Sequence, residues 1–178
     1  QPIEKEGNTT EGMVISYPSA SSGKKRYPYR TYDFSKLVVA PDPLSTTTLK
    51  VDLSDYGSSG RWSRASNDSS ETDVVMIHYR VNKIILDPEY MNNKYELSII
   101  DRTFSNVPLV EEMDFVVIIG AASPEGYTDR NAKLGENRAL ALKSYIMQKF
   151  PYINRDRILT YSMGEDWDGL IHMIESDP

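Results

Sequence analysis

The chain of 178 residues contains no cysteine, only two histidines and no long hydrophobic run. The lack of cysteine excludes disulfides, a thiolate nucleophile and thiolate metal sites. His78 and His172 lie too far apart in the sequence to form a metal-ligand motif, so neither a metal nor a cofactor is expected. No apolar run approaches the roughly 20 residues that a membrane-spanning helix needs. A transmembrane segment is therefore not expected in this chain.

The chain also lacks an excess of basic residues. Lys and Arg number 20 against 26 Asp and Glu, which gives a formal net charge of −6. A nucleic-acid-binding domain normally carries a basic face, so this modest acidity argues against a nucleic-acid partner. Hydrophobic residues make up 39% of the chain, which is enough to supply the core of a globular domain.

Residues 1–72 combine short apolar runs with turn residues. Three runs have the pattern of strands: Met13–Tyr17, Leu37–Ala40 and the alternating stretch 46–53. Ser, Gly, Asn and Asp then dominate up to Thr72, which is typical of a linker or a long surface loop. We therefore expect a small β-rich segment and a Ser/Gly-rich linker over residues 1–72. A second unit, expected to be truncated at its C-terminus, follows over residues 73–178.

Strand and helix patterns alternate in this second unit. Asp87-Pro88-Glu89 is a typical helix start, because Asp can cap free backbone N–H groups and Pro is tolerated in the first turn. The expected elements are a strand over Val74–Leu86, a helix from Asp87, a strand over Phe115–Ile119, a helix over Asp129–Phe150 and a strand over Arg157–Tyr161. This order predicts an α+β fold, a two-layer β-α-β-α-β domain preceded by the small β-rich segment.

The loop Gly120–Gly126 connects the most apolar strand to the clearest helix. Loops at the carboxyl ends of strands in open α/β sheets are common docking places for ligands. Arg138 lies on the apolar stripe of this helix, four residues after Leu134. Burying a bare guanidinium is very costly. Arg138 therefore either anchors a structural ion pair or receives an anionic group of a ligand.

Four short motifs follow one another in this part of the chain: Val81–Pro88, Gly120–Ser123, Asn131-x-x-Leu134-x-x-x-Arg138-Ala139 and Met163-Gly164-Glu165. In their order and spacing they resemble the Leu-x-Pro helix start, the Gly-His-Thr-Asp loop, the Asn-x-x-Leu-Ser-x-x-Arg-Ala helix and the Gly-x-Gly-Glu step of the OmpA-like, peptidoglycan-associating domain. The resemblance covers Val74 to Leu170 and implies an OmpA C-terminal-like fold. The Ala-Ser-Pro-Glu-Gly form of the loop is similar to a branch found in envelope proteins of Gram-negative gut anaerobes.

The resemblance implies a ligand site at four residues: Ser123, Glu125, Asn131 and Arg138. In the family, the helix Arg and the loop Asp grip the diaminopimelate of a peptidoglycan stem peptide, the Arg taking the carboxylate and the Asp the ammonium. A zwitterionic ligand end needs one charge of each sign. Ser123 stands at the position of the Asp and carries no charge, and Glu125, two residues further on, could take its place.

The resemblance further implies a non-enzymatic protein of the cell envelope, in the periplasm or associated with the outer membrane. Its domain would associate with peptidoglycan and tether an outer-membrane or surface structure. The alternative is a degenerate OmpA-like scaffold that has lost peptidoglycan binding and serves surface-structure or adhesin assembly through protein contacts. In either case residues 1–72 are expected to contact an envelope protein partner.

Two further features bear on an enzymatic alternative. The acidic stretch Glu165–Asp168 could supply paired carboxylates for glycoside hydrolysis, but consecutive acids after a strand more often form a solvated turn or a helix cap. Trp62 and Trp167 are expected to cover edges of the core and not to form a sugar platform. An enzyme is therefore the third hypothesis, after the tether and the scaffold.

Overall fold

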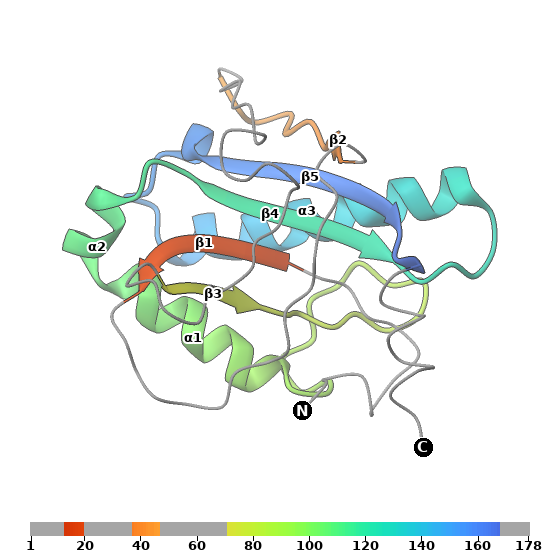
Figure 1. Ribbon diagram of the computed structural model, residues 1–178, viewed down its shortest axis with the longest axis horizontal. Coiled ribbons are helices and arrows are strands. Elements are labelled where there is room, and N and C mark those ends of the chain that lie inside the picture. Colours follow the sequence, from red (N-terminus) through yellow and green to blue (C-terminus); the bar gives the residue numbers. More distant parts are fainter. Residues whose placement is uncertain (1–12, 20–36, 47–70, 168–178) are drawn as a thin grey trace.

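The computed structural model describes the backbone of residues 13–19, 37–46 and 71–167, and the side chains of residues 37–46 and 75–167 (Figure 1). The described elements are β1 (Met13–Ser19), β2 (Val38–Val39), β3 (Glu71–Val75), α1 (Asn93–Ser105), α2 (Val107–Glu112), β4 (Val116–Ala122), α3 (Thr128–Lys149), the 3-10 helix η4 (Arg155–Arg157) and β5 (Ile158–Glu165). They form a small α+β fold. Among the described helices, none is long and apolar enough to cross a membrane.

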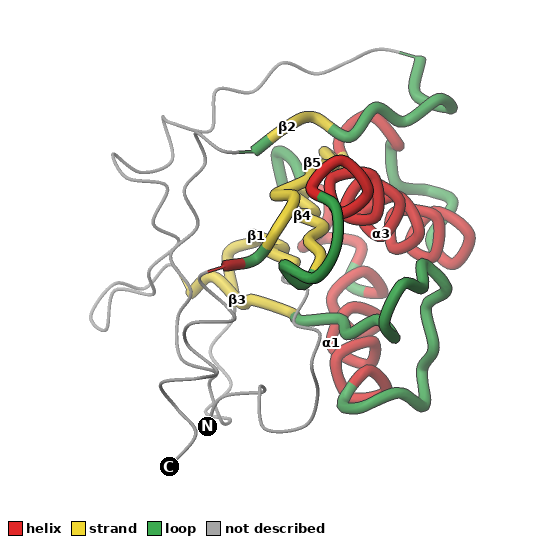
Figure 2. The backbone as a smooth tube through the Cα atoms, turned by 90° about the vertical axis from the view of Figure 1, so that its right-hand side faces the viewer, coloured by secondary structure: helices red, strands yellow, loops and turns green. Residues whose placement is uncertain are grey.

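The strands form a mixed three-stranded sheet and an antiparallel pair. In the sheet, β5 lies between β4, which is parallel to it, and β2, which is antiparallel to it. β1 pairs with β3, and β1 also lies beside β4 (Figure 1). Helices α1 and α3 lie on the same side of the strands (Figure 2).

β4 is buried on both faces, as its continuous apolar run predicts. Val116 and Ile118 point to the helix side, where they join the main core with residues of α1 and α3. Val117 and Ile119 point to the opposite side and pack with Phe115, Leu159 and Tyr161. The strand expected over Phe115–Ile119 and the helix expected over Asp129–Phe150 are thus confirmed as β4 and α3.

Helix α3 packs on β4 at two glycines. A Cβ atom on Gly120 would lie 2.0 Å from the backbone oxygen of Gly135, and one on Gly135 would lie 2.6 Å from Oγ of Ser162. Neither position has room for a side chain. The two glycines therefore set how closely the helix approaches the sheet, and with it the position of the loop between β4 and α3.

The strand expected over Val74–Leu86 is wrong beyond Val75, where β3 ends. Side chains of α1 take the place of a neighbouring strand here. Asn93 accepts a hydrogen bond from the backbone N–H of His78 and donates one to its carbonyl, both at 2.7 Å. The N–H of Met76 donates to Oε2 of Glu96 at 3.3 Å. The backbone is thus satisfied without a regular ladder.

The helix expected to start at Asp87 starts at Asn93. Asp87 does accept a hydrogen bond from a downstream N–H, that of Glu89 at 3.0 Å, but this closes a turn and not a helix. Helix α2 is an addition that the sequence patterns did not predict. It begins after Asn106, whose side chain accepts from the N–H of Leu109 at 3.4 Å.

The strands of residues 1–72 pair with strands of the second unit. β1 pairs with β3, which contains the expected boundary residue Thr72, and β2 pairs with β5. The strands expected over Met13–Tyr17 and Leu37–Ala40 correspond to β1 and β2. The strand expected over 46–53 and most of the Ser/Gly-rich stretch lie outside the described residues.

Candidate functional site

The four residues implied to bind a ligand lie at the carboxyl end of β4 and on α3. Ser123 and Glu125 follow β4 directly, and Glu125 is exposed, whereas Ser123 is half-buried. Asn131 and Arg138 belong to α3, and each is only 2% exposed. The fold thus brings the four residues to the same end of the sheet, with the two helix residues in its interior.

The guanidinium of Arg138 donates hydrogen bonds to backbone carbonyl groups of two separate segments. Its Nη1 lies 3.0 Å from the oxygen of Ala121, at the end of β4. Its Nε and Nη2 lie 2.9 and 3.2 Å from the oxygens of Lys83 and Arg80. Three of the five guanidinium N–H groups are therefore directed at main-chain acceptors, and Arg138 joins the turn at residues 80–83 to β4.

Tyr79 adds an aromatic contact to Arg138. Its ring centre lies 5.3 Å from the guanidinium carbon, within the range of a cation–π interaction. Its hydroxyl donates to the backbone oxygen of Arg138 at 3.1 Å. The guanidinium lies against the last residues of β4, directly before the Ser123–Gly126 loop, and does not project into solvent. Of the two interpretations of Arg138, these contacts favour the structural one, although the partners they show are backbone carbonyls and an aromatic ring and not the acid of the expected ion pair.

Asn131 connects the loop to the end of β5. Its Nδ2 donates to Oε1 of Glu165 at 3.0 Å and to the backbone oxygen of Glu125 at 3.3 Å. Hydrogen bonds from Asn131, then from Trp167 and Thr128, hold the pKa of Glu165 below its ordinary value. Glu165 therefore remains a carboxylate at neutral pH, and Asn131 connects it to the loop that contains Ser123 and Glu125.

Glu165 was not among the four predicted site residues. The Met163-Gly164-Glu165 motif already placed it after the third strand, and that signal could have found it. Of the solvated turn and the helix cap expected over Glu165–Asp168, the solvated turn is wrong for Asp166, which is 4% exposed and whose N–H donates to the oxygen of Ala122 at 2.9 Å. Asp166 directly precedes the helical residue Trp167, as the helix cap requires. Arg80 and Lys83 were also missed, because they contribute backbone oxygens and their side chains carry no signal.

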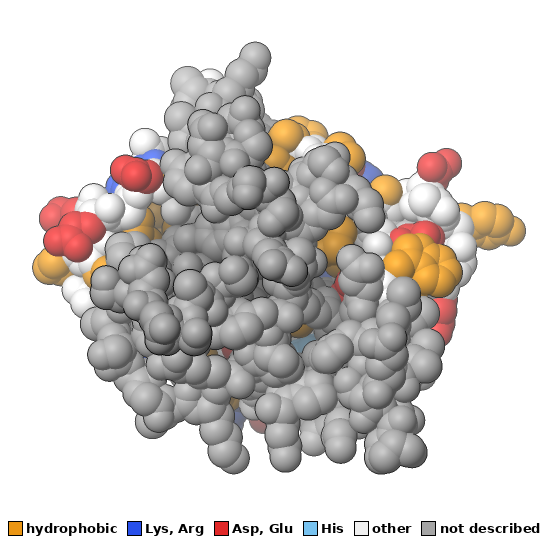
Figure 3. All heavy atoms as spheres, in the orientation of Figure 1, with side chains coloured by type: hydrophobic (Ala, Val, Ile, Leu, Met, Phe, Trp, Pro, Cys, Tyr) orange, Lys and Arg blue, Asp and Glu red, His pale blue; other side chains and the backbone are white. Residues whose placement is uncertain are grey.

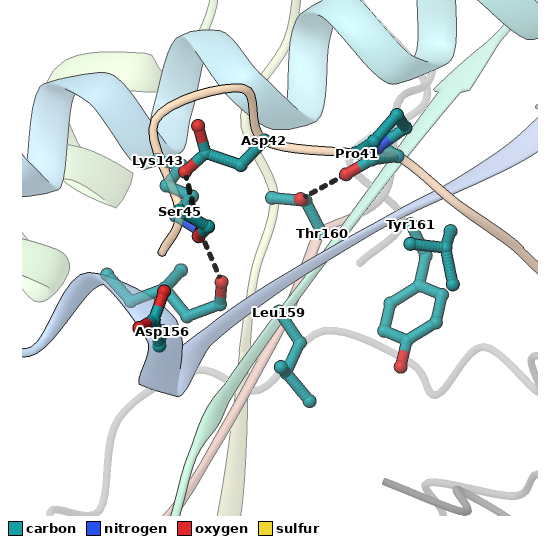
Figure 4. A pocket seen from close by; sticks show the side chains of 11 residues that line it. Pro41, Asp42, Ser45, Lys143, Asp156, Leu159, Thr160 and Tyr161 are labelled. Carbon is teal, nitrogen blue, oxygen red and sulfur yellow. Dashed lines mark hydrogen bonds and ion pairs between the residues drawn. The ribbon is translucent and has the colours of Figure 1, made fainter. Parts of the chain in front are cut away.

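A second group of charged residues lines a pocket at the opposite end of β5 (Figure 4). Lys143 of α3 is 2% exposed, and its Nζ lies 2.8 Å from Oδ2 of Asp42 and 2.8 Å from the oxygen of Ile158. Ser45 lies 3.5 Å from the same Nζ. Thr160 donates to the oxygen of Ala40 at 2.7 Å.

Asp42 is the centre of this group. Its Oδ2 lies 2.6 Å from Nε of Arg155, and its Oδ1 accepts from the N–H of Leu44 at 2.9 Å. Burial alone would raise the pKa of Asp42, but hydrogen bonds from Arg155 and Lys143 outweigh it and hold this pKa well below its usual range. Asp42 thus binds two cations, Lys143 of α3 and Arg155 of η4, and these ion pairs hold the turn after β2 against α3.

No protein-family model, curated protein or solved structure matches the chain. Within the described residues, no three His, Asp or Glu side chains are grouped so that they could hold a metal ion. The sequence motifs and the geometry around Arg138 and Glu165 are therefore the basis for a functional proposal.

Proposed function

We propose that this chain is a non-enzymatic cell-envelope protein whose OmpA-like domain is a scaffold for surface-structure or adhesin assembly. The main support is the position of Arg138. In the family that the motifs resemble, this arginine takes the carboxylate of the ligand. Here its guanidinium is buried and donates to three backbone carbonyls. A ligand carboxylate would have to compete with these acceptors for the guanidinium, and the oxygen of Ala121, whose hydrogen bond to Arg138 is buried, would lose this donor at a cost of about 1–3 kcal/mol.

The loop gives a second reason for the scaffold role. Ser123 stands where the family has an Asp, and a hydroxyl group supplies no negative charge for the ammonium of diaminopimelate. Losing one charge-assisted contact removes about 1.5–3 kcal/mol, or roughly ten- to a hundredfold in affinity. Both halves of the family's charge pair are thus weakened in this chain, one by burial and one by replacement.

The scaffold would work in the periplasm or at the outer membrane through protein contacts. Residues 1–72 are the proposed contact region for an envelope partner. Their strands β1 and β2 pair with β3 and β5. A partner bound to residues 1–72 would therefore be connected directly to the sheet of the domain.

Peptidoglycan association is the second candidate, and Glu125 favours it. This carboxylate is exposed, lies two residues after Ser123, and its backbone oxygen accepts from Asn131 at 3.3 Å. Glu125 would then hold the ammonium group in place of the family's Asp. For this candidate the turn at residues 80–83 would have to release Arg138 when the ligand binds.

Two binding experiments separate the candidates. Purified peptidoglycan sacculi are mixed with the wild type, and diaminopimelate is titrated into the same protein by calorimetry. If the domain is a scaffold, diaminopimelate should not displace any protein retained on the sacculi. Its titration should also release or absorb no heat of binding. Binding by the wild type that is lost in Glu125→Gln would overturn the scaffold in favour of peptidoglycan association.

Ser123→Asp tests why binding is lost. If the missing charge is the cause, this variant binds diaminopimelate although the wild type does not. If the buried Arg138 is the cause, the variant does not bind either. Ser123→Asn is the matched control, because it adds similar volume without charge.

A further inference from the structure

Two large aromatic side chains are exposed where β5 ends and α3 begins. Tyr127, directly before α3, is 83% exposed, and Trp167, two residues after β5, is 54% exposed. In Figure 3 hydrophobic side chains lie beside carboxylates at this end of the molecule. The expectation that Trp167 covers a core edge is therefore wrong, since more than half of it faces solvent. Trp62 lies outside the described residues.

One carboxylate connects the two aromatic positions. Nε1 of Trp167 donates to Oε2 of Glu165 at 3.0 Å. Asn131, whose side chain donates to the other oxygen of Glu165 at 3.0 Å, donates its backbone N–H to the oxygen of Tyr127 at 3.0 Å. The indole of Trp167 and the backbone of Tyr127 are therefore connected through Glu165 and Asn131, although they come from different elements.

The indole ring is held in place before any ligand binds. Its N–H is hydrogen-bonded to Glu165, whose other carboxylate oxygen is bound by the buried Asn131 at 3.0 Å. A ring fixed in this way loses little conformational freedom when something stacks on it, which lowers the cost of binding. A carboxylate offers about four acceptor positions, and the hydrogen bonds from Asn131 and Trp167 use two of them. The carboxylate can therefore also accept from a hydroxyl group.

The surroundings of the rings are polar. Residues 125–130 are all exposed, and apart from Tyr127 they are Glu, Gly, Thr, Asp and Arg. A protein interface normally has a contiguous apolar centre, which these neighbours do not provide. Isolated aromatic rings next to hydrogen-bonding groups suit the face of a pyranose ring, which presents C–H groups in the middle and hydroxyls at its edge.

We propose that Tyr127 and Trp167 form a binding site for a neutral saccharide chain. The rings stack on successive sugar units, and Glu165 accepts a hydrogen bond from a sugar hydroxyl. Glu125, Asp129 and Glu165 make the site acidic, so acidic saccharides are repelled. The site does not use Ser123 or the Arg138 guanidinium, and it goes beyond the proposed scaffold function without resting on it.

Fluorescence of Trp167 tests this site. In a Trp62→Phe background Trp167 is the only tryptophan, because the chain has two. We titrate this protein with cellotetraose and with a tetramer of β-1,4-linked N-acetylglucosamine, and use tetragalacturonate as the acidic comparison. At least one neutral tetramer is expected to give a saturable change, with tetragalacturonate binding at least tenfold more weakly.

Substitutions then locate the binding. Tyr127→Ala in the same background is expected to weaken binding of the neutral tetramer at least tenfold. Trp167→Ala should weaken it equally, and because this variant lacks the fluorescent residue, its binding is measured by calorimetry. Tyr95→Ala is the matched control, because Tyr95 is 44% exposed on α1 and should leave affinity unchanged. Melting curves from circular dichroism confirm that each variant is folded.

Two results would overturn the proposal. One is an unchanged spectrum with both neutral tetramers, which would leave the rings as a surface for protein contact. The other is a Tyr127→Ala variant that binds as tightly as its parent. Binding of diaminopimelate has no influence on either outcome, so this test and that of the scaffold function fail separately.

Discussion

The ammonium group of Lys143 lies 2.8 Å from the carboxylate of Asp42, and the two side chains are only 2% and 4% exposed. Asp42→Asn would leave the lysine charge buried without its counter-ion. Breaking a buried pair by removing one partner typically costs about 3–5 kcal/mol. We therefore expect the free energy of unfolding, measured in urea, to fall by about that amount.

The control for this variant is a pair near the surface. Asp101 binds Lys149, but their side chains are 30% and 47% exposed. Solvent-exposed ion pairs contribute about 0–1 kcal/mol, so Asp101→Asn should cost little. Equal losses in the two variants would show that burial does not distinguish the two pairs.

The stability of the protein should depend on pH in a way that Asp42 accounts for. Hydrogen bonds from Arg155 and Lys143, acting against burial, hold the pKa of Asp42 well below its ordinary value of 3.8. A carboxyl group with a depressed folded-state pKa stabilises the protein fully above its unfolded pKa and loses this contribution as the pH falls through the folded one. Between about pH 5 and about pH 3, the free energy of unfolding should therefore drop more steeply in wild type than in Asp42→Asn. Urea titrations at several pH values measure both slopes, and parallel curves would contradict the prediction.

Gly135→Ala should destabilise the protein, although helix propensity predicts the reverse. In an exposed helix, alanine is favoured over glycine by about 1 kcal/mol. The new Cβ on Gly135 would lie 2.6 Å from Oγ of Ser162 and 2.8 Å from the oxygen of Gly120. Overpacking of this kind costs about 1–3 kcal/mol. Urea unfolding decides between the two effects, and a gain in stability would show that α3 can move away from β4.

Arg138→Lys should destabilise the protein although it keeps the charge. A lysine ammonium does not reproduce the planar fork of donors, and leaving the buried oxygen of Ala121 without its donor costs about 1–3 kcal/mol. We expect a loss of at least that size, with faster hydrogen exchange at residues 80–83. Arg130→Lys on the exposed first part of α3 is the control and should change stability by about 0.5 kcal/mol or less. Unchanged stability in Arg138→Lys would mean that Arg138 is not a structural anchor.

The sequence patterns predicted β4 and α3 well, but they predicted the segment between β3 and α1 poorly. The apolar run of β4 and the helical spacing of α3 depend on neighbours along the chain, so local periodicity predicts them. The segment after Val75 begins with the apolar Met76 and Ile77, but the backbone partners there are the side chains of Asn93 and Glu96. Nothing in the local pattern distinguishes that arrangement from a strand.

In the candidate site, too, the sequence determined some features and the tertiary structure determined others. The sequence by itself determined that Arg138 lies on the inner face of a helix after a small-residue loop, and that Ser123 brings no charge to that loop. Only the tertiary structure decided that Arg138 binds the carbonyls of Arg80, Lys83 and Ala121. The reason is physical: the side chain's need for partners follows from its type, but backbone oxygens are the same at every residue. Which of them meet the guanidinium depends on how distant segments pack together.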